Sequence, residues 1–202
     1  MQKEIKVWDI GVRTFHWSLV VLFFIAYITG EDEDLIHIYS GYAVSALVIF
    51  RIVWGFIGTK YARFSNFIYG RDRVVQYARS VFTPRPLHYI GHNPLGGWMI
   101  VLVLILLTIT CWSGLEVYGA DGHGPLAHAS VIATAVADEG KGHKAGKSPQ
   151  EKFWEEIHEV FANITLSLII LHICGVIVAS FIHRENLVRA MITGYKKDSD
   201  SP

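Results

Sequence analysis

Four stretches of the chain are apolar for long enough to cross a lipid bilayer, which takes about 20 residues in a helix. They cover about residues 12–30, 35–58, 94–115 and 157–181. The stretch from Pro94 to Leu115 contains no charged residue, whereas a helix of a soluble protein presents at least one polar face to water. The pattern predicts an all-α integral membrane protein, a four-helix bundle that forms a single domain over residues 1–202.

The first apolar stretch follows Lys3, Lys6 and Arg13 and could be mistaken for a secretion signal. No cleavage site of the small-x-small type follows it, and it carries a histidine near its start. We therefore expect this segment to be retained as the first membrane helix.

Loop charges predict the orientation of the helices. One acid, Asp72, stands in the loop between the second and third apolar stretches against six basic residues. These are Lys60, Arg63, Arg71, Arg73, Arg79 and Arg85. The loop between the first two stretches is acidic over residues 31–34, and the segment after the fourth stretch is basic. Because basic loops stay in the cytoplasm, we expect both termini to be cytoplasmic and the long loop of about residues 119–156 to be periplasmic.

Composition agrees with a membrane protein and narrows its chemistry. Apolar residues make up 51% of the chain and charged residues 18%, against about 25% charged in a typical soluble domain. The formal net charge is zero, which gives no indication of a nucleic-acid partner. The two cysteines, Cys111 and Cys174, lie in apolar stretches and outside any C-x-x-C-H motif. This excludes a covalently attached c-type haem and favours small buried apolar residues.

Four of the ten histidines fall within or at the edges of the predicted spans: His16, His37, His158 and His172. An ionisable residue inside a membrane costs several kcal/mol unless it is paired, so it indicates a function. The last two are 14 residues apart on one predicted helix. That spacing is about 40° short of four full turns and places them on one face, roughly 21 Å apart along the axis.

The predicted orientation gives each histidine a depth in the membrane. His16 and His172 fall near the cytoplasmic side, and His37 and His158 fall near the periplasmic side. Two imidazoles at each of two depths are suited to two b-type haems, and bis-histidine ligation leaves no open axial position, which favours electron transfer. Satisfied core or interfacial histidines are the alternative. Zinc needs more ligands than two at each depth.

Two arginines stand close to the predicted inner histidine pair. Arg51 follows His37 by 14 residues and so lies on the same helix face near the inner depth, and Arg13 lies close to His16. A haem propionate is a candidate partner for both charges. Snorkelling toward the cytoplasmic interface would also explain them. Gly41 and Gly175 lack side chains near two of the histidines, where a porphyrin or a neighbouring helix could approach.

The sequence resembles the family of bacterial cytochrome b561 and nickel–iron hydrogenase b-type cytochrome subunits. The motifs that carry the resemblance are VWDIGVRTFHW at 7–17, LIHIYSGY at 35–42, RIVWGFIG at 51–58, GHNPLGGW at 91–98, the pair His158 and His172, and AMITGYK at 190–196. They cover nearly the whole chain outside residues 119–152.

The resemblance implies a dihaem b cytochrome of the bacterial inner membrane. Such a protein passes electrons between the quinone pool and a periplasmic partner, a hydrogenase or a c-type cytochrome, and an oligomer is compatible with this role. The family's four haem ligands match His16, His37, His158 and His172. His92 belongs to the GHNP motif but not to that ligand set, so we expect it to be structural or interfacial.

Two rival functions stay open from the sequence. Some members of the family oxidise superoxide at the outer surface and reduce quinone. The acidic loop at 31–34 counts against steering of that anion, an objection weakened by four lysines, Lys141, Lys144, Lys147 and Lys152. The other rival is a structural or transport protein without redox chemistry. The long loop also contains His123, His128 and His143, which we expect to be solvated and not to bind a metal.

Overall fold

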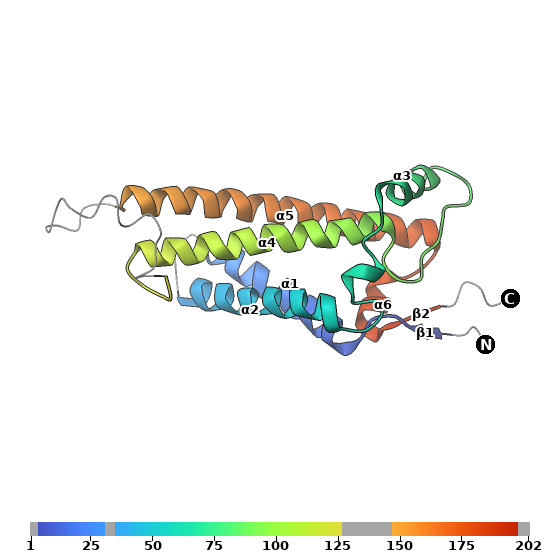
Figure 1. Cartoon of the computed structure of the whole chain (residues 1–202), viewed down its shortest axis with the longest axis horizontal. Helices are drawn as coiled ribbons and strands as arrows, with labels where there is room; N and C mark the ends of the chain where they lie inside the picture. Colours follow the sequence, from blue (N-terminus) through green and yellow to red (C-terminus); the bar gives the residue numbers. More distant parts are fainter. Residues whose placement is uncertain (1–3, 31–34, 127–146, 198–202) are drawn as a thin grey trace, which may run out of the picture. The chain divides into compact units, whose positions relative to one another are not determined.

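The computed structural model describes residues 4–30, 35–126 and 147–197. Four of its helices are long and apolar enough to cross a membrane (Figure 1). They are α1 (Ile10–Ile28), α2 (Leu35–Ile57), α4 (Pro94–Ala120) and α5 (Pro149–His183). This confirms the predicted all-α class and the four predicted membrane segments.

Two of these helices begin before the apolar stretch, because polar residues cap them. Asp9 accepts a hydrogen bond from the Val12 amide (2.9 Å), so α1 begins at Ile10. At the start of α5, the Glu151 amide donates to Ser148 Oγ (3.1 Å) and the Ser148 amide donates to Glu151 Oε2 (3.2 Å). This reciprocal capping box starts α5 at a proline, well ahead of the apolar span predicted from about residue 157.

Several short elements connect or follow the long helices. They are β1 (Glu4–Lys6), η1 (Phe64–Asn66), α3 (Arg71–Ser80), α6 (Leu187–Thr193) and β2 (Tyr195–Lys197). The strands β1 and β2 pair antiparallel, with Lys6 opposite Tyr195. Gly194 ends α6 with a φ of +89°, and a Cβ there would come within 2.7 Å of the Trp8 carbonyl oxygen. Only glycine suits that left-handed position.

Backbone contacts divide the chain into two compact units. The first unit comprises residues 1–104 and 167–202, and the second comprises residues 105–166. In the first unit, α1 and α2 pack along each other (Figure 1), and a small apolar core joins both chain ends. Its buried members are Val7, Trp8, Val12, Ala62 and Ala190.

The second unit contains the later part of α4 beside the first part of α5. Thr110 Oγ1 and Thr165 Oγ1 are 3.4 Å apart, and the Thr165 side chain is fully buried. Each of these hydroxyls also bonds a carbonyl one turn back on its own helix. These two hydroxyls are therefore satisfied within the unit, as a bilayer requires.

Candidate functional site

The first pair of predicted ligands comes together within the first unit. His16 is on α1 and His172 is on α5, and the two rings are close enough for a charge on one to affect the other. Both side chains are partly buried. The His16 Nδ1 atom is buried and has no hydrogen-bond partner. The structure thus places the two histidines predicted for the inner depth within electrostatic range of each other.

Asp9 fixes the start of the helix that carries His16. Besides capping α1, its carboxylate accepts hydrogen bonds from Thr59 Oγ1 (2.5 Å) and Trp54 Nε1 (3.3 Å to each oxygen). Burial alone would raise the pKa of Asp9, but the hydrogen bonds from Thr59, Val12 and Trp54 outweigh it and lower the pKa. The first turn of α1 is therefore tied to the last turns of α2 through an ionised carboxylate.

The two predicted arginines are placed differently. Arg13 donates from Nη2 to the carbonyl oxygen of Ile192 near the end of α6, and its buried Nε has no partner. Arg51 is only 2% exposed, so it does not snorkel to a surface. Its guanidinium lies over the rings of Phe64 (5.2 Å) and Phe67 (5.8 Å), and its buried Nη1 has no hydrogen-bond partner. A buried cation with an open donor is suited to an anionic ligand group.

His92 lies closer to this region than the sequence suggested. Its ring contacts Trp8 (4.4 Å between centroids) and Phe67 (4.7 Å), and its Nδ1 is buried without a partner. Burial, together with the nearby charges of Arg51 and Lys196, lowers the pKa of His92 to about 3. His92 is therefore neutral at physiological pH, and it is close enough to His172 for the two to interact electrostatically. The GHNP motif indicated His92 in the sequence, but it did not predict the contacts of this residue with Trp8 and Phe67.

His37 is oriented by the end of α1. Its Nδ1 lies 2.8 Å from the carbonyl oxygen of Ala26, to which it donates. That carbonyl belongs to the last turn of α1, where helical acceptors lack a partner of their own. A histidine that donates from Nδ1 carries its lone pair on Nε2, the tautomer that binds a metal through Nε2.

His158 has the same orientation within the second unit. Its Nδ1 is 2.9 Å from the carbonyl oxygen of Thr110, to which it donates, and 3.1 Å from Ser113 Oγ. Ser113 is 1% exposed. A Cβ on Gly114 would come within 3.0 Å of His158 Cε1, so a glycine leaves room for the ring. Sequence reasoning missed Ser113 and Gly114, because no local pattern marks a residue that only supports a ligand.

The donor set fits a haem iron better than a metal ion held by protein groups alone. No group of three or more His, Cys, Asp or Glu side chains gathers into a metal-binding set within the described residues. The histidines instead offer single imidazoles, and the Nδ1 atom is buried in His16 and hydrogen-bonded in His37 and His158. A Cβ on Gly41 or Gly175 would meet no atom within 4 Å, which is compatible with a flat ligand beside α2 and α5.

Part of the predicted periplasmic surface lies outside the described residues. This applies to the acidic loop at 31–34, to His128 and His143, and to Lys141 and Lys144. His123 is described, and its Nδ1 lies 3.0 Å from Asp121 Oδ2 with both side chains about 60% exposed. It is an exposed ion-pairing residue, in agreement with the expectation of a solvated histidine.

Comparison with known proteins decides the family. The family model described as prokaryotic cytochrome b561 matches residues 7–194. The chain belongs to the prokaryotic cytochrome b561 family. It is therefore a multi-pass bacterial membrane protein, a b-type cytochrome that binds haem b and takes part in electron transfer.

The most similar relatives include three proteins named probable Ni/Fe-hydrogenase B-type cytochrome subunit. The protein from Rhodobacter capsulatus is 23% identical, in an alignment that covers 98% of this chain and 83% of the relative. The proteins from Rhizobium leguminosarum bv. viciae and Cupriavidus necator are 20% and 21% identical, each over 98% of this chain and 91% and 89% of the relative. No solved structure matches the chain significantly.

Proposed function

We propose that this cytochrome is one domain with two haems b and passes electrons between the quinone pool of the inner membrane and a redox partner at the periplasmic face. His16 and His172 hold the inner haem, and His37 and His158 hold the outer haem. The observation that carries the proposal is the matched orientation of His37 and His158. Each donates from Nδ1 to a helix carbonyl oxygen, which presents Nε2 for iron.

A bound haem supplies one-electron cycling between ferric and ferrous iron. The protein's own contribution would be four imidazoles, from His16, His172, His37 and His158, that are held in place to bind haem iron. The Ala26 and Thr110 carbonyls fix the ring planes of the outer pair, and the Asp9 network fixes the helix that bears His16. Ligands held in this way would move little during electron transfer, which would favour a rapid reaction. Arg51 and Arg13 supply positive charge for the haem propionates.

The names of the relatives support a nickel–iron hydrogenase as the periplasmic partner, with a c-type cytochrome as the alternative within the same role. Both termini face the cytoplasm in this proposal. The acidic loop at 31–34 counts against the superoxide alternative, and the four lysines Lys141, Lys144, Lys147 and Lys152 weaken that objection. Of these, Lys147 forms an ion pair with Glu155 (2.8 Å), which reduces the positive charge available to steer an anion.

Four single substitutions test the ligand assignment, with haem counted by the pyridine haemochrome method. We expect two haems per wild-type chain and one in each of His16→Ala, His172→Ala, His37→Ala and His158→Ala. His123→Ala is the matched control, since it removes an exposed histidine in an ion pair, and it should keep both haems.

The pairing is tested by the haem that remains. His16→Ala and His172→Ala should leave the same haem, with one midpoint potential and one electron paramagnetic resonance spectrum. His37→Ala and His158→Ala should leave the other. If His16→Ala leaves the haem that His158→Ala leaves, the proposed pairing is wrong.

A further inference from the structure

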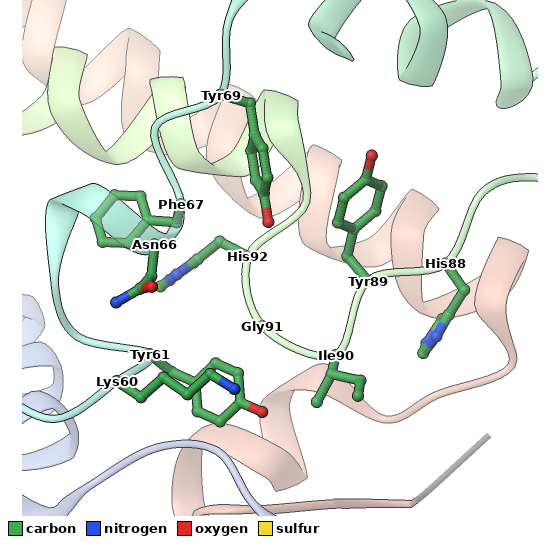
Figure 2. Close-up of a pocket in the computed structure, with 10 residues that line it drawn as sticks. All are labelled: Lys60, Tyr61, Asn66, Phe67, Tyr69, His88, Tyr89, Ile90, Gly91 and His92. Atoms are coloured by element: carbon green, nitrogen blue, oxygen red, sulfur yellow. The ribbon is translucent and has the colours of Figure 1, made fainter. Parts of the chain in front are cut away.

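A pocket of about 430 Å³ lies in the first unit, between the segment after α2 and the segment before α4 (Figure 2). Its volume falls within the range of about 300–1,000 Å³ that is usual for small-molecule sites. The rings of Tyr61, Tyr69 and Tyr89 surround it, and the amide of Asn66 lies at its rim (Figure 2). Aromatic walls with a few polar groups are suited to a flat ring that carries oxygen atoms.

One side of this pocket adjoins the proposed inner haem site. His92 lines the pocket and is near enough to His172 and Arg51 for their charges to interact. Phe67, which also lines the pocket, contacts the His92 ring and lies under the Arg51 guanidinium. A ligand in the pocket would therefore lie beside His92, which is within electrostatic range of His172, and beside Phe67, which lies under Arg51.

His88 lies toward the other side of the pocket and belongs to a charged network (Figure 2). Its Nε2 donates to Glu185 Oε1 (2.8 Å), and Lys196 Nζ donates to Glu185 Oε2 (3.0 Å). The side chains of Glu185 and Lys196 are only 14% and 7% exposed, whereas that of His88 is 27% exposed. His88 therefore contacts both the pocket and water, while Glu185 and Lys196 are mostly buried and held in place by their ion pair.

Glu185 stays ionised in this network. Burial alone would raise its pKa, but the hydrogen bond from His88 and the charge of Lys196 lower the pKa to about 2. His183 is the other histidine close by, with its ring 5.4 Å from that of His88 and its Nε2 3.3 Å from Tyr77 OH. The Glu185 carboxylate accepts the Nε2 proton of His88, and this holds the imidazole in place and fixes its tautomer.

We propose that this pocket binds the head group of the quinone and that His88 carries protons between the quinone oxygens and the aqueous phase. This rests on the proposed function, in which quinone exchanges electrons with the protein. The quinone takes two electrons, one at a time, from reduced haem b and two protons, and each carbonyl becomes a hydroxyl. His88 keeps Nε2–H on Glu185 and delivers each proton from Nδ1, and water then reprotonates it. Quinol oxidation runs the same steps in reverse.

The test follows reoxidation of the reduced, two-haem protein by decylubiquinone in a stopped-flow spectrometer. We expect His88→Ala to slow this reaction about 100-fold or more, the usual contribution of a positioned acid–base group. Added imidazole should restore part of the rate. Oxidation by ferricyanide, which needs no proton, should be unchanged. His123→Ala removes a histidine with a similar carboxylate partner outside the pocket and should behave as wild type.

A second variant tests the pocket without changing His88. Asn66 is exposed and lines the pocket, so Asn66→Trp fills the rim without disturbing the core. We expect it to raise the quinone concentration for half-maximal rate about tenfold, with ferricyanide oxidation unchanged.

The outcomes separate the two proposals. Wild-type protein that keeps both haems but does not react with quinone refutes the quinone part of the proposed function, and the pocket proposal with it. A wild-type reaction that both variants match refutes only the pocket. Unchanged quinone kinetics together with loss of a co-purified anionic phospholipid in His88→Ala would assign the pocket to a lipid head group instead.

Discussion

Arg51 is a buried cation whose contribution to stability should change sign when haem binds. It is 2% exposed, and its Nη1 has no hydrogen-bond partner. If a haem propionate is its partner, Arg51 destabilises the haem-free protein and increases the affinity of the folded protein for haem. Arg51→Met tests this, because methionine fills similar space without the charge.

The size of the effect follows from the surroundings of the guanidinium. Removing such an ion from water costs several kcal/mol after relaxation. The two ring contacts, at 5.2 and 5.8 Å, offset about 0.5–2 kcal/mol each. Replacing the cation by methionine should therefore stabilise the haem-free chain by about 1–4 kcal/mol. In the haem-bound protein it removes at least one charge-assisted hydrogen bond of about 1.5–3 kcal/mol, so affinity for the inner haem should fall at least about tenfold.

The assay compares protein made in haem-limited and haem-replete cells. Thermal unfolding of the haem-limited protein should shift upward by several degrees in Arg51→Met. Titration of the same protein with haemin should show the weaker inner site, and Arg51→Lys should be intermediate because it keeps the charge but loses the planar fork. A variant that unfolds at lower temperature without haem, and still binds both haems as tightly as wild type, would refute the reasoning. Arg51 would then serve the packing of Phe64 and Phe67.

Two further predictions concern residues that support others. Ser113→Ala removes a buried hydroxyl beside His158 Nδ1 while the Thr110 carbonyl still accepts. Affinity for the outer haem should fall about two- to tenfold, and an unchanged affinity in a haemin titration would argue against this support. Glu185 has a pKa of about 2, below its ordinary value of 4.5. Its contribution, at most about 3 kcal/mol, is present above pH 4.5 and is lost as the pH falls toward 2. Glu185→Gln should flatten the acid side of a plot of unfolding temperature against pH, and an unchanged slope would contradict this.

The membrane helices were predictable because their formation depends on composition over about 20 residues, which the sequence displays directly. The start of α5 was not apparent from hydropathy. Residues 149–156 are polar, and the apolar pattern begins later. Their helical state depends on the capping box between Ser148 and Glu151, a local hydrogen-bond signal that hydropathy does not contain. The short elements β1, β2, α3 and α6 likewise depend on packing partners, not on long periodic patterns.

The candidate site also has features that the sequence predicted and features that only the fold reveals. The sequence predicted the inner pairing of His16 and His172 from spacing and loop charge, and the structure places these residues near each other. The sequence could not reveal which carbonyl orients His37, because that contact depends on how α1 and α2 pack. The bond between His88 and Glu185 joins residues that are 97 positions apart. No local motif marks such a pair, so a fold was needed to find it.

The motif at residues 7–17 and the motif at residues 190–196 pack against each other in the structure. The amides of Val7 and Trp8 donate to the Gly194 carbonyl (2.8 and 3.1 Å), and Arg13 donates to the Ile192 carbonyl. The core beneath these bonds contains residues from both ends. The C-terminal motif therefore acts on the proposed inner haem site at a distance. It fixes the segment that leads into α1, and α1 in turn sets the position of His16. Residues of that motif need not touch a haem to matter for its binding, because a ligand on a membrane helix is only as fixed as the end of the helix that carries it.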